Sequence, residues 1–197
     1  MQSLTKLAVI AAALCLMLGG LRAADDAKGV KVGDKAPAFE GTDDQGKTWK
    51  STDHVGKKVV VVYFYPADFT GGCTKQACSF RDDFTKLTDK GVEVVGVSGD
   101  SAKTHELFKK EHKLPFTLLA DEKGEIAKKF GVPVKVGAAK AKASIAGKDQ
   151  EVERSATIQR WTFVIGKDGT VAYKNTKVNP PLDAKAIAEF IAKADGK

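Results

Sequence analysis

The chain has few cysteines, few histidines and only one long apolar run. Its 197 residues include three cysteines and three histidines, and neither a low-complexity tract nor an internal repeat is visible. The histidines at 54, 105 and 112 have no metal-ligand spacing to the cysteines, so we expect no metal site. A content of 43% hydrophobic and 29% charged residues is typical of a globular protein. The length suits one domain whose core needs no disulfide.

The long apolar run lies at the N-terminus and is typical of a secretory signal peptide. Lys6 supplies a short positive segment, residues 7–18 are apolar, and small residues allow cleavage after Ala23 or Ala24. The run is short for a membrane span. We therefore expect cleavage and no stable membrane association afterwards, with a retained anchor as the alternative.

This N-terminal pattern sets the expected organisation of the chain. We expect a signal peptide over residues 1–23, a flexible lead-in over 24–32 and one domain over 33–197, in a periplasmic or secreted protein. Cys15 is then discarded, and the mature chain keeps Cys73 and Cys78 in an oxidising compartment.

The remaining charge excess is small and scattered. Without residues 1–23 the chain keeps 30 basic and 25 acidic residues, which is typical of a solvated surface. The densest basic stretch, residues 135–148, has no aromatic residue between its lysines. We therefore expect no nucleic-acid binding.

Strands and helices alternate along the rest of the chain. Residues 59–65 are an unbroken β-favouring run, which indicates a strand buried on both faces of a sheet. The other expected elements are a hairpin around 43–46, a helix over 73–87, a strand over 92–100, a helix over 101–112 capped by Ser101, a strand over 115–121, a helix over 124–130, a hairpin over 161–174 and a helix over 182–194. This order predicts an α/β, thioredoxin-like three-layer fold with a central mixed β-sheet flanked by helices. We expect residues 134–159 to form an extended surface loop with room for one helical turn.

The cysteine pair follows the predicted buried strand, in the stretch YFYPADFTGGCTKQACSFRD. Pro66 ends the strand, and the apolar spacing places Cys73 in the first turn of a helix. Free N–H groups and the helix dipole favour a thiolate there. Thr70 can aim its hydroxyl at the same point. Arg160, just before another predicted strand, can hold the thiolate, with Arg81 and Arg154 as competitors.

Cys78 lies five residues after Cys73. On one ideal helix their Cα atoms are roughly 8.6 Å apart, whereas disulfides rarely tolerate more than about 7 Å. A permanent structural disulfide is therefore disfavoured. A disulfide that forms and breaks, with local unfolding, fits the spacing better.

The stretch closely resembles the active-site block of peroxiredoxins, in particular the bacterioferritin comigratory protein / peroxiredoxin Q group. Pro66, Thr70 and Cys73 match its Pro-x-x-x-Thr-x-x-Cys pattern, and FRD follows the second cysteine. VGDKAPAF, VVGVSGD, LPFTLLAD and RWTFVIGKDGTV resemble its remaining blocks in the same order. The resemblance covers about residues 31 to 195.

The resemblance implies a thiol peroxidase that acts on hydrogen peroxide or organic hydroperoxides. Carried over by position, Cys73 is the peroxidatic thiol, Cys78 the resolving thiol, Thr70 a hydrogen-bonding partner of peroxide and thiolate, Arg160 the activating arginine and Pro66 a shield of the pocket. A thioredoxin-like protein is the implied reductant, and no metal or organic cofactor is required. We expect a monomer.

Two features depart from the group, and two alternatives stay open. Gly71 stands where the group has proline, and the 134–159 segment is longer and more basic. An exported thioredoxin-fold thiol-disulfide oxidoreductase would normally show Cys-x-x-Cys. A copper-binding chaperone would need closer cysteines and a histidine ligand.

Overall fold

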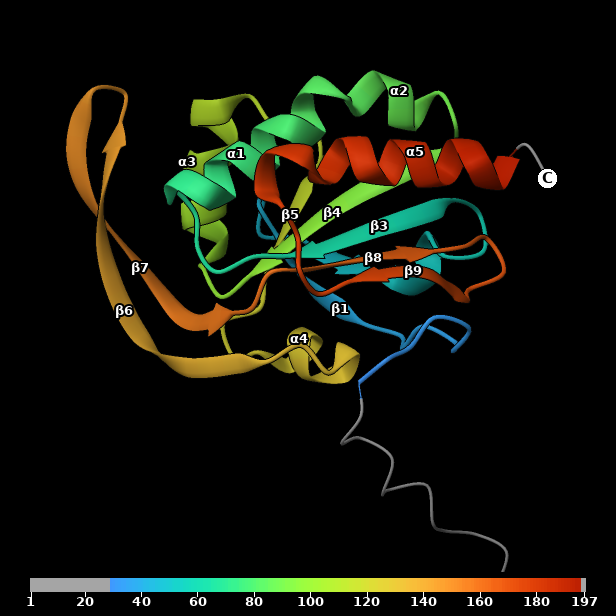
Figure 1. Cartoon of the computed structure of the whole chain (residues 1–197). Helices are drawn as coiled ribbons and strands as arrows, with labels where there is room; N and C mark the ends of the chain where they lie inside the picture. Colours follow the sequence, from blue (N-terminus) through green and yellow to red (C-terminus); the bar gives the residue numbers. More distant parts are fainter. Residues whose placement is uncertain (1–28, 196–197) are drawn as a thin grey trace, which may run out of the picture.

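A mixed β-sheet forms the middle of the molecule. The computed structural model describes residues 29–195, and within them seven strands pair in the order β2-β1-β5-β4-β3-β8-β9 (Figure 1). The strands are β1 (Glu40–Asp43), β2 (Thr48–Lys50), β3 (Val59–Phe64), β4 (Val92–Ser98), β5 (Thr117–Ala120), β8 (Trp161–Ile165) and β9 (Val171–Asn175). Strand β3 pairs in parallel with β4 and antiparallel with β8. The predicted buried strand is therefore central, with neighbours on both sides.

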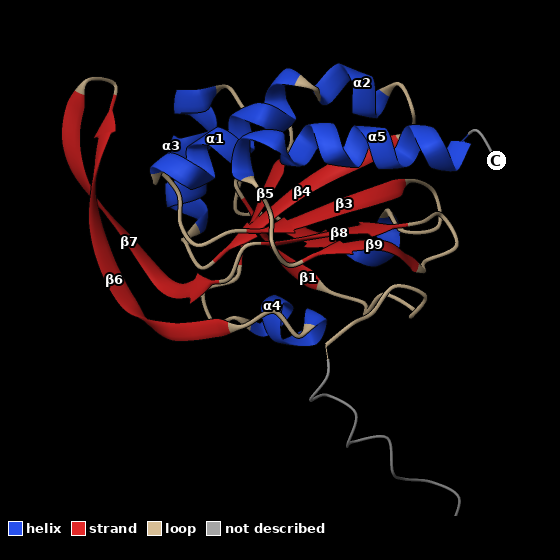
Figure 2. Cartoon of the chain, in the orientation of Figure 1, coloured by secondary structure: helices blue, strands red, loops and turns tan. Residues whose placement is uncertain are grey.

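Helices cover both faces of this sheet, which confirms the predicted three-layer, thioredoxin-like arrangement. Helices α1, α2, α3 and α5 lie over one face, and the short α4 lies against the other (Figure 2). They are α1 (Gly71–Asp82), α2 (Phe84–Thr88), α3 (Ala102–His112), α4 (Glu125–Phe130) and α5 (Asp183–Asp195), with single 3-10 turns η1 (Ser51–Asp53) and η2 (Pro180–Leu182).

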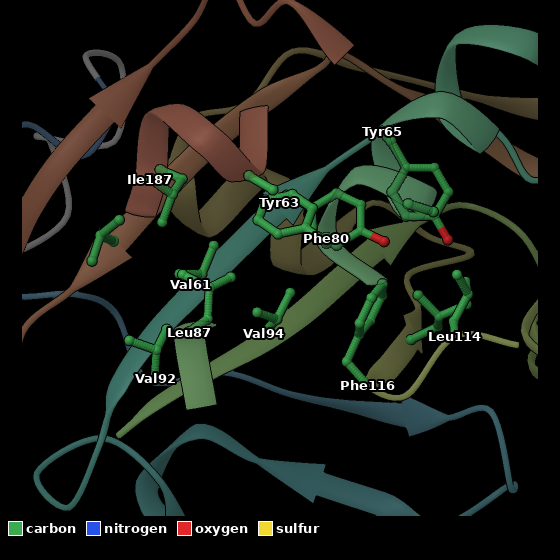
Figure 3. Packing of buried hydrophobic residues seen from close by; sticks show 14 of the residues in the cluster. Val61, Tyr63, Tyr65, Phe80, Leu87, Val92, Val94, Leu114, Phe116 and Ile187 are labelled. Atoms are coloured by element: carbon green, nitrogen blue, oxygen red, sulfur yellow. The ribbon is translucent and has the colours of Figure 1, made fainter. Parts of the chain in front are cut away.

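Alternation along β3 divides the core between the two faces. Val61 and Tyr63 point to the α1 side, where they meet Phe80 of α1 and Ile187 of α5 (Figure 3). Val60 and Val62 point to the α4 side. Because successive side chains of a strand face opposite ways, a run without polar residues fills both layers.

The predicted helix over 73–87 is wrong in one respect. Cys73, Ala77, Phe80 and Leu87 are buried on one side of this segment, but α1 ends at Asp82 and α2 begins at Phe84. Asp83 between them has φ −96° and ψ 7°, outside the helical region. Aspartate is a weak helix former, and here two follow one another.

The predicted surface loop over 134–159 is also wrong. Strands β6 (Val134–Ile145) and β7 (Lys148–Ile158) form a long antiparallel hairpin that extends beyond the main sheet. Its turn is Ala146–Gly147, where both residues have positive φ, as a two-residue type I′ turn requires. Alanines alternate with lysines along β6, but alanine has a low strand preference, so the period-two signal was weak.

The remaining expectations concern the ends of elements and of the chain. Ser101 caps α3 by accepting the N–H of Thr104, as predicted.

The predicted signal peptide lies outside the described residues. The end of the expected lead-in contacts the domain, because the Val30 N–H donates to the Phe130 carbonyl. Within residues 29–195, no helix is long and apolar enough to span a membrane.

Candidate active site

Cys73 lies at the start of α1, at the end of the central strand. It is the third residue of the helix and 1% exposed, among apolar neighbours. Thr70 is the N-cap residue, and its carbonyl accepts the N–H of Thr74. The first backbone N–H groups of a helix have no partner within it, and the dipole is positive at that end. The helix start therefore stabilises negative charge that develops beside the sulfur.

Arg160 reaches the same point from another strand. Trp161 at the start of β8 pairs with Phe64 at the end of β3, so the residue before β8 lies beside the loop that leads to α1. Its Nη2 donates to the Cys73 Sγ at 3.1 Å. The competing arginines bind elsewhere: Arg81 contacts Asp82 and the His112 carbonyl, and Arg154 contacts Thr157. The structure therefore selects Arg160 as the cation at the thiol.

A series of hydrogen-bonded polar side chains connects Arg160 to the interior. Its Nη1 donates to the Gln76 Oε1, and the Gln76 Nε2 donates to the Asp183 Oδ2 at 2.7 Å. Thr162 Oγ1 donates to the same carboxylate oxygen at 2.7 Å. Sequence reasoning did not single out these three residues. Of the three, only Gln76 could have been found from the sequence, because a residue three positions after Cys73 lies on the same face of the predicted helix.

Thr70 lies at the start of α1, three residues before Cys73, and its hydroxyl contact differs from the expectation. The Thr70 hydroxyl donates to the Ala67 carbonyl at 3.0 Å instead of pointing its hydrogen at the thiol. This bond closes the turn before α1 and leaves the oxygen lone pairs available. Pro66 is partly buried directly after Tyr65.

The loop between Pro66 and Thr70 is fixed by a buried cluster of titratable groups. The Asp68 N–H donates to Asp100 Oδ2 at 3.0 Å, and the Tyr65 hydroxyl donates to Asp68 Oδ1 at 2.8 Å. His105 Nδ1 lies 2.7 Å from Asp68 Oδ2, with both side chains inaccessible to solvent. His105 thus belongs to α3 and lies in the interior of the protein. Phe69, in the same loop, holds a positive φ of 58°.

The cluster has shifted protonation equilibria. Burial, and then the charge of Asp68, raise the pKa of Asp100 to about 6 from 3.8. Burial lowers the pKa of His105, but attraction to Asp68, their hydrogen bond and the charge of Asp100 outweigh it, so the net shift is upward. Burial also raises the pKa of Asp183 behind Arg160, against its hydrogen bonds from Thr162 and Gln76.

Cys78 lies in α1 with Cys73, as the distance estimate assumed. It is partly exposed, and both cysteines of the described part are free. Two residues five apart on one helix point in different directions, so the sulfurs can bond only if the start of α1 unwinds.

The described residues contain no group of three or more His, Cys, Asp and Glu side chains placed to hold a metal ion. His54 stacks on Trp49 and lies 2.8 Å from a Glu93 oxygen, and His105 is engaged with Asp68.

The family relationship follows from the match over this region. A family model described as AhpC/TSA family matches residues 32–174, which include both cysteines, Thr70 and Arg160 but not Asp183. The chain belongs to the AhpC/TSA family. Within the family its relatives are peroxiredoxins. It is 44% identical over 144 residues to a chloroplastic peroxiredoxin Q of Oryza sativa subsp. japonica, with 73% of this chain and 58% of that protein covered. It is also 40% identical over 143 residues to a Coxiella burnetii protein named as a peroxiredoxin bcp, with 73% and 86% covered.

Solved structures of the family agree with the fold. Peroxidoxin BcpB from Mycobacterium tuberculosis superposes with a TM-score of 0.69 at 28% identity, covering 83% of this chain and 97% of that one. The bacterioferritin comigratory protein of Xanthomonas campestris gives 0.65 at 26% identity, covering 81% and 92%. This family member spans only about half the length of the plant relatives, 58% for the rice protein and 48% for that of Populus jackii.

Proposed function

We propose that this peroxiredoxin is a thiol-dependent peroxidase that reduces hydrogen peroxide and organic hydroperoxides. The observation that carries the proposal is the 3.1 Å contact of Arg160 Nη2 with Cys73 Sγ at the start of α1. A cation and a helix N-terminus around one buried sulfur favour a nucleophilic thiolate and stabilise negative charge on an oxygen that departs beside it. The Xanthomonas campestris relative is described by its alkyl peroxide reduction activity, which supports the substrate class.

The first step takes place at Cys73. Its thiolate attacks one peroxide oxygen, an S–O bond forms, and the O–O bond breaks with its electron pair on the second oxygen. That oxygen takes a proton and leaves as water or an alcohol, while the sulfur is oxidised to a sulfenic acid. Arg160 neutralises the charge that moves onto the departing oxygen, and the Thr70 hydroxyl oxygen can accept a hydrogen bond from the O–H of the bound peroxide.

The second step regenerates the enzyme through Cys78. Its thiolate attacks the sulfenic sulfur, a disulfide forms, and the hydroxyl group leaves as water after taking a proton. The first turns of α1 must unwind for the sulfurs to meet. A thioredoxin-like dithiol then returns two electrons by thiol-disulfide exchange. No metal or organic cofactor takes part.

The experiment compares Cys73→Ser with Cys78→Ser in peroxide consumption, using several dithiol proteins as reductants. Cys73→Ser is expected to consume no peroxide, and full consumption by that variant would end the proposal. Cys78→Ser is expected to complete one turnover and hold a sulfenic acid at Cys73, detected by mass spectrometry after trapping. An unmodified Cys73 in that variant would refute the resolving role of Cys78.

We further propose that the protein acts as a monomer in the periplasm or outside the cell, after loss of residues 1–23. The signal-peptide pattern of the sequence supports this location. N-terminal sequencing of the exported protein is expected to begin at Ala24 or Asp25. A start at Met1 in the membrane fraction would favour the retained anchor instead.

A further inference from the structure

A buried carboxylate is connected to the arginine of the site through one amide. Asp183, the first residue of α5, is 2% exposed. Its Oδ2 accepts from Gln76 Nε2 and from Thr162 Oγ1, each at 2.7 Å. Gln76 is inaccessible to solvent, and its other end accepts from Arg160 Nη1. The connection thus runs from Asp183 through Gln76 and Arg160 to Cys73, across segments 107 residues apart in the chain.

The orientation of the Gln76 amide decides whether this connection exists. A glutamine amide has one end that donates and one that accepts, whereas a guanidinium group only donates. The ionised carboxylate of Asp183 only accepts, so it selects the NH2 end of Gln76. The carbonyl end must then face Arg160. With the amide reversed, its NH2 group and the guanidinium would be two donors facing each other.

We propose that Asp183 is a positioning residue, which orients Gln76 so that its carbonyl holds Arg160 over the Cys73 sulfur. The inference rests on the proposed function only for the role of that sulfur. Thr162 supports the arrangement, because its hydroxyl gives the same carboxylate oxygen a second donor. The hydrogen bonds of the Asp183 side chain go to Gln76 and Thr162 and not to Cys73.

The proposal is distinguishable from a direct effect of charge. The negative charge of Asp183 by itself opposes a second negative charge on Cys73. Removal of that charge alone would therefore raise the thiolate fraction at a given pH. Loss of the connection lowers the thiolate fraction instead, because Arg160 is no longer held at the sulfur. The two explanations predict opposite signs.

The test measures Asp183→Ala, Gln76→Leu and the double variant in the full mature chain. The readouts are the thiolate fraction of Cys73 across pH, from absorbance near 240 nm in a Cys78→Ser background, and the rate of single-turnover oxidation by hydrogen peroxide. Each single change is expected to lower the rate about tenfold, the scale of one hydrogen bond to a charged group. The double variant is expected to be no slower than either single one, because both break the same connection.

Two further variants separate positioning from folding. Asp183→Asn keeps one acceptor oxygen for Gln76 and is expected to recover most of the rate lost in Asp183→Ala. Asp121→Ala removes another buried aspartate, which accepts the N–H groups of Ile126 and Ala127 in α4 on the opposite face of the sheet. It is expected to lose stability but keep the thiolate fraction. If Asp183→Ala does not fold, Asp183→Leu fills the space without an acceptor.

Three results would overturn the inference: an unchanged or higher thiolate fraction in Asp183→Ala, additive losses in the double variant, or an equal rate loss in Asp121→Ala. The thiolate readout needs no peroxide. It therefore tests the role of Asp183 even if Cys73→Ser were to retain full peroxide consumption and the proposed function failed.

Discussion

The protein should be more stable at acidic pH, because the buried cluster around Asp68 contains a carboxyl group, that of Asp100, with a raised pKa. The pKa shift of Asp100 gives the expected change in the free energy of unfolding. Its carboxylate is 1% exposed and accepts from the Asp68 N–H at 3.0 Å and the Ser98 hydroxyl at 2.6 Å. Burial, followed by the charge of Asp68, raises the pKa of Asp100 to about 6 from 3.8. The folded protein therefore binds this proton more tightly than the unfolded chain. The free energy of unfolding must then fall as pH rises through the folded-state value.

The pKa difference sets the magnitude. About two pH units correspond to about 3 kcal/mol of unfolding free energy in total, and about 1.4 kcal/mol of it is lost between pH 5 and pH 8. His105 acts with the same sign, because its raised pKa gives stability at low pH that is lost as pH rises. The reduced protein is thus expected to lose stability over this interval.

The perturbation is Asp100→Asn, which keeps an acceptor for the Asp68 N–H but cannot titrate. Guanidinium chloride unfolding of the reduced protein at pH 5 and pH 8 gives the unfolding free energies. The loss between these pH values is expected to be about 1.4 kcal/mol smaller in the variant than in the wild type. The matched control, Asp53→Asn, changes an exposed aspartate and should follow the wild type. Parallel curves for Asp100→Asn and the wild type would refute the reasoning.

Three other predictions concern the site and its surroundings. Arg160→Met removes the donor to the Cys73 sulfur and should slow single-turnover peroxide reduction, measured by stopped flow, at least about tenfold. An unchanged rate would contradict the proposed role of Arg160 in stabilising charge at that sulfur. Gly71→Pro should stabilise the protein by about 0.4–1 kcal/mol and slow disulfide formation, because a side chain at Gly71 meets no atom and Thr70 before it has an extended backbone. A loss of stability in thermal unfolding would contradict this prediction. Ile145→Ala removes a buried side chain of the β6–β7 hairpin, from the cluster that packs on Phe69 in the loop before α1. It should speed disulfide formation about fivefold in quenched-flow alkylation, whereas a slower rate would show that the hairpin does not restrain this loop.

Local sequence patterns predicted much of the fold because the deciding forces act between near neighbours. The unbroken run at residues 59–65 required a strand buried on both faces, and Ser101 predicted the helix start it caps. The same reasoning was wrong where local signals were weak. Asp83 interrupts the predicted helix after Asp82, and much of strand β6 is alternating alanine and lysine, which have a low strand preference.

Hydrogen-bond partners within the site were less predictable than the positions of its residues. Cys73 and Arg160 meet as expected because β8 pairs with β3. The Thr70 hydroxyl turns to the Ala67 carbonyl, a contact that depends on the shape of the loop and not on residue type. The pairing of His105 with Asp68 was not predicted, since a sequence does not show which of several helical positions faces a buried aspartate.

The sequence by itself determined where the sulfur of the proposed nucleophile lies along the chain: at the start of a helix, after a buried strand, with a second thiol on the same helix. Only the tertiary structure decided what surrounds that sulfur. Arg160 is 87 residues from Cys73, and Asp183 is 107 residues from Gln76. Spacing and propensity act over a few residues, whereas these contacts depend on strand register and on the packing of α5 against α1. The sequence thus placed the proposed nucleophile, and the packed layers supplied the polar groups around it.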